Sequence, residues 1–258
     1  MESNNKLILV CNDDGVKAPG ITALIEVARK FGDVVVVAPD KPQSGMGHAI
    51  TLNSTLRVNK VREEQGLEVY SCTGTPVDCV KLAVNEVLKR KPDLIVSGIN
   101  HGSNASINII YSGTMSAAIE GCLEGIPSVG FSLLDHSIDA DFEASAHYAE
   151  KVIDQVFENS LPEGVCLNVN IPQLHKDDIM GIKVCRQANA NWEEEFDERK
   201  DPSGARYYWL TGVFKNYDQG TDTDIWALEN KFVSVVPVQY DLTSHKGLVG
   251  IKKWKFDV

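Results

Sequence analysis

The sequence lacks any long apolar run. No stretch approaches the roughly 18 consecutive apolar residues that are typical of a membrane-spanning helix. The amino-terminal residues, MESNNK, are polar and are not followed by the apolar segment of a secretory signal peptide. These absences lead us to expect a cytoplasmic protein with no membrane partner.

Paired cysteines and an excess of positive charge are also missing. The six cysteines are scattered, with no CxxC pair, so we expect buried thiols rather than a disulfide framework or a thiolate metal site. The formal net charge is −11 and the sequence pI is about 5.0. An acidic chain argues against binding to nucleic-acid polymers, short ends excepted, or to anionic membranes. A small anion could still be held by local groups or by a metal.

Strand-like and helix-like patterns alternate along the first two-thirds of the chain. Of the 258 residues 43% are hydrophobic, enough for a sizeable core. Strands are predicted over 7–11, 33–38, 52–61, 67–71, 93–97, 128–132 and 165–170, and helices over 21–31, 76–88, 115–123 and 142–157. This order predicts an α/β fold: a Rossmann-like parallel sheet with helices on both faces.

The pattern changes after about residue 172. A charged cluster over 192–201 is followed by β-rich runs over 206–213 and 232–238. We therefore predict a core over 1–172 and, over 173–258, a β-rich extension that packs on it and serves as an oligomerisation arm. The apolar runs TDTDIWAL and FVSVVPV are expected to leave unpaired strand edges on a monomer, which favours a homodimer or homotetramer.

Asp13 and Asp14 directly follow the first predicted strand. In open α/β sheets, ligands bind outside the carboxyl ends of the strands. Asp side chains often bond nearby backbone N–H groups in turns, which is one interpretation of this pair. The other is a divalent-cation site, because a cation removes the repulsion between adjacent carboxylates and Mg²⁺ binds oxygen ligands.

Further polar residues follow other strands of the same sheet. Ser44, in QSGMG, is either part of a flexible loop or a hydroxyl ligand. Asn100, in SGIN, is either a turn residue or a neutral oxygen ligand. Ser112 and Thr114, in YSGT, could cap the next helix; together with Gly113 they could also bind an anion at its N-terminus.

The histidines give weaker signals. Three of them are expected at the surface: His136, His147 and His175. His48 and His101 fall in the site loops but lack metal-ligand spacing, and His245 has no predicted role.

Several segments resemble the SurE survival-protein family of nucleotidases. They span Leu7 to about His245 and read ILVCNDDGVKAPGI, VVVVAPDKPQSG, TGTPVDCVKLAV, PDLIVSGINHGSN, IYSGTMSAAIEG, LNVNIP and DTDIWALENKFVSVVPVQYDLTSH. The resemblance implies a Rossmann-like core with a C-terminal β-hairpin arm that makes dimers or tetramers. It also implies a metal-dependent phosphatase acting on nucleoside monophosphates at the 5′ or 3′ position.

The resemblance assigns residues of this chain to roles. It implies one divalent cation, Mg²⁺ or Mn²⁺, held by Asp13, Asp14, Ser44 and Asn100. It implies phosphate contacts from Asn104, Ser112, Gly113 and Thr114. Ser44, next to a glycine that exposes its backbone N–H, is also expected to face the phosphate. We expect hydrolysis by direct attack of a metal-bound water, which either Asp13 or Asp14 orients or deprotonates.

Three other kinds of protein can have acidic residues after the first strand, and this chain departs from two of them. An aspartyl-phosphate phosphatase carries its general acid two residues after the nucleophile, where this chain has Gly15. A response-regulator receiver carries a phosphoacceptor Asp where this chain has Asn100, and is about half as long. A nucleotide sensor without catalysis would bind nucleotide and release no phosphate.

Overall fold

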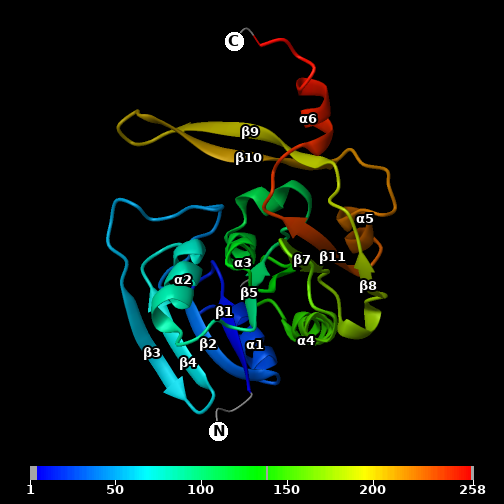
Figure 1. Cartoon of the computed structure of the whole chain (residues 1–258). Helices are drawn as coiled ribbons and strands as arrows, with labels where there is room; N and C mark the ends of the chain where they lie inside the picture. The colour runs from blue at the N-terminus through cyan, green and yellow to red at the C-terminus, as the bar shows by residue number, and fades with distance from the viewer. Residues whose placement is uncertain (1–4, 138, 257–258) are drawn as a thin grey trace.

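The core of the molecule is a nine-stranded, mostly parallel sheet (Figure 1), seen in a computed structural model that describes residues 5–137 and 139–256. Its spatial order is β3-β4-β2-β1-β5-β6-β7-β11-β8. The strands are β1 Lys6–Cys11, β2 Gly32–Pro39, β3 Val58–Glu64, β4 Leu67–Cys72, β5 Leu94–His101, β6 Ser128–Leu133, β7 Val165–Ile171, β8 Gly181–Val184 and β11 Phe232–Gln239. The predicted α/β class is confirmed.

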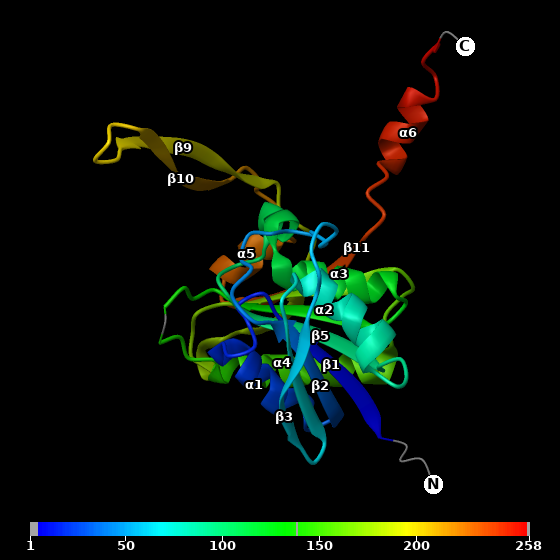
Figure 2. The ribbon, with the colours of Figure 1, turned by 90° about the vertical axis from the view of Figure 1, so that its left-hand side faces the viewer.

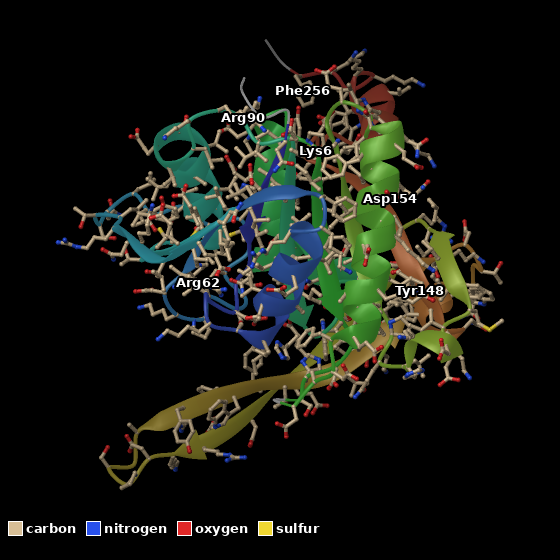
Figure 3. All side chains as sticks on the ribbon, turned by 90° about the horizontal axis from the view of Figure 1, so that it is seen from below. Lys6, Arg62, Arg90, Tyr148, Asp154 and Phe256 are labelled. Carbon is tan, nitrogen blue, oxygen red and sulfur yellow. The ribbon has the colours of Figure 1, made fainter. Side chains whose placement is uncertain are left out.

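Helices cover both faces of the sheet, as predicted. On one face α1 and α4 lie side by side (Figure 3), and α2 and α3 pack together on the other (Figures 1 and 2). The α-helices are α1 Pro19–Ala28, α2 Pro76–Leu82, α3 Gly113–Leu123, α4 Glu143–Asn159, α5 Asp224–Glu229 and α6 His245–Ile251. A π-helix, η1 Ala83–Val87, extends α2, and two 3-10 helices complete the set, η2 Ser106–Tyr111 and η3 Lys176–Asp178. No helix among the described residues has the length and apolar character needed to cross a bilayer.

Strand β1 shows why both faces are apolar. Ile8 and Val10 belong to the core cluster under α1 and α4, whereas Leu9 and Cys11 belong to the cluster under α2. Successive side chains of a strand point to opposite faces, so a strand covered on both sides must be apolar throughout. All six cysteines are buried free thiols, as expected.

The sheet departs from the prediction in direction and in strand length. β3 runs antiparallel to β4, and β11 antiparallel to β7. The strand predicted over 52–61 forms only from Val58, while β5 continues to His101. Asn100 therefore sits within a strand, at a register position opposite Ser132 of β6.

The arm is a hairpin whose position differs from the prediction. β9 (Ala190–Lys200) contains the charged cluster and pairs with β10 (Arg206–Asn216) as a separate two-stranded sheet. It extends away from the body in all three views (Figures 1–3).

The expectation of unpaired edges at TDTDIWAL and FVSVVPV is wrong. TDTDIWAL forms α5, which buries Ala227 and Leu228. FVSVVPV is β11, whose backbone is paired with β7 on one side and β8 on the other. Satisfied backbone groups leave no edge there. The division at residue 172 stays a prediction; beyond it, β8 and β11 belong to the same sheet as the preceding strands.

Candidate active site

A cavity of about 710 Å³ lies at the carboxyl ends of β1 and β5. From this pair the sheet grows in opposite directions, through β2 on one side and β6 on the other, which is the switch point where open α/β sheets bind ligands. The volume is within the roughly 300–1,000 Å³ range of small-molecule sites. The lining residues include five of the predicted site residues: Asp13, Ser44, Asn100, Asn104 and Ser112.

Asp13 is buried directly after β1 and is fixed by the start of α3. The hydroxyl of Thr114 donates a hydrogen bond to Asp13 Oδ1 at 2.5 Å. Gly113 allows this approach, because a Cβ added at Gly113 would lie 2.6 Å from Asp13 Cβ. Thr114 does not line the cavity; it orients the carboxylate that does.

Burial is the main influence on the protonation of Asp13. Desolvation raises the pKa of its carboxyl group, the hydrogen bond from Thr114 lowers it, and the neighbouring charge of Asp14 raises it, giving a value of about 6. The negative form of Asp13 is therefore unfavourable without a compensating positive charge.

Asp14 is half-buried and contacts a different element. Its Oδ2 lies 3.4 Å from both the backbone N and the ring Nδ1 of His101, at the end of β5. The His101 ring packs edge-on against Phe142 with centroids 5.0 Å apart. Asp14 does not line the cavity, but His101 does. The two carboxylates are thus held by separate partners.

Asn100 presents an oxygen to this region. Its side-chain amide donates through Nδ2 to the carbonyls of His101 and Gly102, at 3.2 and 2.9 Å. With the nitrogen engaged in this way, Oδ1 is the atom available to a ligand.

Ser44 lies on an exposed loop that is tied to the site on both sides. The backbone N–H of Gln43 donates to the Asp13 carbonyl at 2.8 Å, and that of Gly47 to the Tyr111 carbonyl at 3.2 Å. Both bonds lead back to segments of the site. Ser44 itself lines the cavity.

The far end of the same loop is held by a buried carboxylate that sequence reasoning missed. Glu120 of α3 lies 2.9 Å from His48 Nε2 and 2.5 Å from Lys81 Nζ. Burial raises the pKa of Glu120, but the hydrogen bonds from His48 and Lys81 outweigh it and lower the pKa overall. Asp78 of α2 adds bonds to the backbone N and hydroxyl of Thr51.

Asn104 is held over the cavity by a buried polar network. Its Nδ2 donates to Ser132 Oγ at 2.7 Å, its backbone N–H to Asn170 Oδ1 at 2.8 Å, and its carbonyl accepts from Asn168 Nδ2 at 2.8 Å. Asn168 and Asn170 are the two asparagines of LNVNIP in β7. That motif therefore fixes the loop after β5, a role that its sequence did not indicate.

The N-terminus of α3 faces the same place. Ser112 caps the helix by accepting a hydrogen bond from the backbone N–H of Met115 at 3.0 Å. The first N–H groups of a helix lack carbonyl partners within the helix, and its dipole favours negative charge there. The predicted anion-binding and capping roles of this segment are therefore compatible.

The residues present fit a hard divalent cation. The available donors are carboxylate oxygens of Asp13 and Asp14, Asn100 Oδ1 and the Ser44 hydroxyl, all of the kind that Mg²⁺ and Mn²⁺ prefer. The buried Asn12 Oδ1, beside Asp13, has no hydrogen-bond partner in the described part of the chain. Residues 5–137 and 139–256 contain no cluster of three or more His, Cys, Asp or Glu suited to a metal.

The opposite wall of the cavity comes from the C-terminal region and was missed by sequence analysis. It comprises Trp192 and Phe214 of the hairpin and Ile225, Leu228 and Glu229 of α5. His136, predicted at the surface, is exposed but also lines the cavity. Periodicity gave no signal for this wall, because the residues belong to three separate elements.

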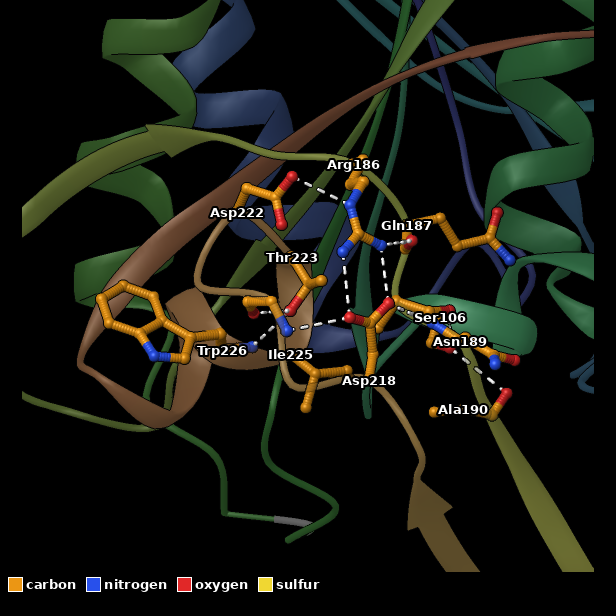
Figure 4. A network of polar contacts seen from close by, with 12 residues as sticks. Ser106, Arg186, Gln187, Asn189, Ala190, Asp218, Asp222, Thr223, Ile225 and Trp226 are labelled. Carbon is orange, nitrogen blue, oxygen red and sulfur yellow. Dashed lines mark hydrogen bonds and ion pairs between the residues drawn. The ribbon is translucent and has the colours of Figure 1, made fainter.

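An ion-pair network fixes the base of the hairpin (Figure 4). Arg186 binds Asp218 through two nitrogens, at 2.6 and 2.9 Å, and Asp222 through Nε at 2.9 Å. The guanidinium holds the pKa of Asp218 well below its usual range. Arg186 precedes β9 and both aspartates follow β10, so these bonds join the two ends of the hairpin.

Asp224 connects this base to the loop after β5. Its Oδ1 accepts from the backbone N–H of Ala188 at 2.9 Å and its Oδ2 from that of Ser106 at 2.7 Å. Ser106 has a φ of 54° and donates its hydroxyl to the Ala188 carbonyl at 2.9 Å. The hairpin is therefore anchored beside the cavity.

Comparison with known proteins identifies the family. The family model for Survival protein SurE matches residues 8–194. The chain belongs to the SurE family. The matched residues contain the NDDG, SGIN and YSGT segments and extend into β9, so the resemblance inferred from these motifs is confirmed.

Relatives and a solved structure of this family match nearly the whole chain. A protein of Flavobacterium psychrophilum named 5′-nucleotidase SurE is 61% identical over 96% of this chain and 97% of its own length. The 5′-nucleotidase SurE of Flavobacterium johnsoniae is 60% identical over 100% of both chains. The crystal structure of SurE protein from Aquifex aeolicus superposes with a TM-score of 0.83 at 40% identity, covering 95% of this chain and 98% of that one.

Proposed function

We propose that this protein is a metal-dependent 5′-nucleotidase that hydrolyses nucleoside monophosphates to nucleoside and phosphate, and that it also accepts 3′ esters. The names of its SurE relatives support the reaction. The observation that carries the proposal is one cavity that joins the oxygen donors after β1 and β5 to the N-terminus of α3 and to an aromatic wall.

The chain's own residues would share the work as follows. Asp13, Asp14, Ser44 and Asn100 would hold Mg²⁺ or Mn²⁺, which when bound neutralises phosphate charge and acidifies water. The backbone of Ser112 and Gly113 and the side chain of Asn104 would bind the remaining phosphate oxygens. Thr114 would keep the Asp13 carboxylate in place through its hydrogen bond.

The proposal includes direct attack of water on phosphorus, without an aspartyl phosphate. A covalent route needs an acid near Asp13 to protonate the leaving oxygen, and Gly15 occupies the usual position. Direct attack inverts the configuration at phosphorus, whereas two successive displacements retain it. A chiral, isotopically labelled phosphate ester distinguishes these outcomes, and observed retention would overturn direct attack.

Phosphate release from a panel of nucleoside 5′- and 3′-monophosphates tests the activity. We expect release with Mg²⁺ or Mn²⁺, loss in excess EDTA and recovery on adding metal back. Full activity in EDTA by metal-free protein contradicts the metal assignment. Saturable nucleotide binding without phosphate release would identify a sensor instead.

We also propose that the hairpin is the interface of a homodimer or homotetramer. Seven large hydrophobic side chains are exposed on it: Trp192, Phe196, Tyr207, Tyr208, Trp209, Leu210 and Val213. Exposed apolar patches of this kind mark interaction surfaces. Light scattering at micromolar concentration tests the proposal, since a clean monomer contradicts it.

A further inference from the structure

The cavity has two chemically different ends. At the sheet edge it is lined by oxygen donors, including Asp13 and Asn100. At the other end the side chains are aromatic or aliphatic, from the hairpin and α5, and Glu229 is the one carboxylate among the lining residues there. A ligand that fills both ends needs an anionic group and a flat or apolar body.

Two aromatic rings form the hairpin's part of this wall. Trp192 and Phe214 are directly opposite each other in the β9–β10 register. Their ring centroids are 5.5 Å apart at an interplanar angle of 65°, an edge-to-face arrangement. The indole Nε1 of Trp192 donates to Asn108 Oδ1 at 2.8 Å, which fixes the ring toward the loop after β5.

This wall is built before any ligand arrives. Arg186 and Asp218 join the two ends of the hairpin (Figure 4). Asp224 accepts hydrogen bonds from the backbone N–H groups of Ala188 and of Ser106, which lies in the loop after β5. Trp192 is four residues beyond Ala188, so its backbone is held close to these bonds. A fixed aromatic surface binds a flat ligand with little loss of conformational entropy.

We propose that Trp192 and Phe214 form the nucleobase-binding wall of the cavity and make the enzyme select phosphate esters that carry an aromatic base over sugar phosphates that lack one. This inference rests on the proposed nucleotidase function. Glu229, the carboxylate that lines the cavity at this end, disfavours a phosphate there. The phosphate therefore binds at the sheet edge and the base against the rings. Asn108 acts as a positioning residue for Trp192.

The test compares two substrates that differ only by the base. Kinetics with adenosine 5′-monophosphate and ribose 5-phosphate are measured in the same metal buffer for wild type and Trp192→Ala. We expect the kcat/KM ratio of nucleotide to sugar phosphate to fall about tenfold in the variant, mainly through KM, since stacking on an aromatic side chain is lost. Trp192→Phe should restore most of the ratio, while Trp192→Leu should not.

Trp254→Ala is the matched control, because Trp254 is an exposed tryptophan that does not line the cavity. It should leave both substrates unaffected. Equilibrium binding of adenosine, measured by calorimetry, should weaken in Trp192→Ala and not in Trp254→Ala. Asn108→Ala should give a smaller loss in the same direction.

The outcomes separate the two proposals. Equal losses of kcat/KM on both substrates would show that Trp192 acts through stability. Recovery of the ratio in Trp192→Leu would show that only the bulk of the side chain matters. Either result would overturn the inference of a nucleobase-binding wall. An unchanged ratio in Trp192→Ala would overturn it as well. If wild type releases phosphate from neither substrate, the nucleotidase proposal fails; if it hydrolyses both with equal efficiency, only the base-binding inference fails.

Discussion

Side chains at the sheet edge and side chains on the β9–β10 hairpin form hydrogen bonds with different kinds of partner. At the edge, Asp13, Asn104 and Glu120 each bond to residues far away in the sequence. Along the hairpin, side-chain bonds run between its own strands, as from Tyr208 to Glu198 and from Tyr217 to Glu193. The edge is thus fixed by distant parts of the body, whereas the outer part of the hairpin is fixed mainly by bonds between its own strands.

One face of the hairpin links the two regions. Trp192 and Phe214 line the cavity, and farther out on the same face Phe196 is opposite Leu210. Alternate residues of a strand share a face, so the two apolar pairs lie on one face, with Glu194 opposite Gly212 between them. The inner pair lines the cavity and carries the proposed nucleobase wall, whereas the outer pair is exposed and belongs to the proposed subunit interface.

The largest expected effect is the loss of kcat when the carboxylates at the sheet edge are changed. Asp13→Asn and Asp14→Asn should each reduce kcat by at least about 100-fold, because in the proposed mechanism each carboxylate holds the cation and orients the reacting groups. Steady-state phosphate release in saturating Mg²⁺ or Mn²⁺ measures this. Near-normal kcat in either variant would show that its carboxylate does not contact the cation.

Stability provides the control for those variants. Burial and the charge of Asp14 both raise the pKa of Asp13, so at pH 7 its ionised form destabilises the metal-free fold. Asp13→Asn should therefore melt a few degrees higher than wild type without metal. A lower melting temperature would mean that lost activity reflects misfolding.

Shortening the hairpin should separate the two functions of its apolar face. Replacing Phe196–Leu210 by Asn-Gly, a two-residue hairpin turn, keeps Trp192 and Phe214 and removes the outer apolar pair. Light scattering should then report a monomer, while the preference for nucleotide over ribose 5-phosphate stays within about threefold of wild type. A shortened protein that stays oligomeric places the interface elsewhere.

A smaller effect is expected from the bonds of Glu120 that hold the loop containing Ser44. Glu120→Gln weakens the bonds to His48 and Lys81 and should raise KM about threefold to fivefold, with little change in kcat. Glu124→Gln, one turn farther along from Glu120, is the matched control and should leave KM unchanged. Equal effects of the two variants would show that general surface charge is responsible.

The smallest effect concerns acid stability. The folded protein has a lowered pKa at Glu120 relative to the ordinary 4.5, so its ionised form stabilises the fold above about pH 4.5 and this contribution is lost as the pH falls further. Denaturant unfolding measures the free energy of unfolding at pH 6 and at pH 3. Between these two values it should fall by roughly 1 kcal/mol less in Glu120→Gln than in wild type, as for a charged hydrogen bond. An equal fall in the free energy of unfolding for both proteins would contradict this prediction.

Local sequence patterns predicted much of the fold and of the polar residues at the sheet edge. Apolar runs such as Leu7–Cys11 predicted buried strands because both faces of the sheet are covered. The residues after those strands predicted Asp13, Ser44 and Asn100 around one cavity, since strand ends of a parallel sheet converge. Charged strand β9 was missed because solvent surrounds it and no apolar periodicity is required there.

By itself, the sequence determined the layered α/β core and the set of oxygen donors at its edge, because strand period and strand ends are local features of the chain. Tertiary structure alone decided that β11 lies inside the sheet, that Glu120 holds the Ser44 loop and that Trp192 faces the cavity. Each of these depends on contacts between elements that are distant in the chain, and the identity of such partners is set by packing rather than by the neighbouring residues.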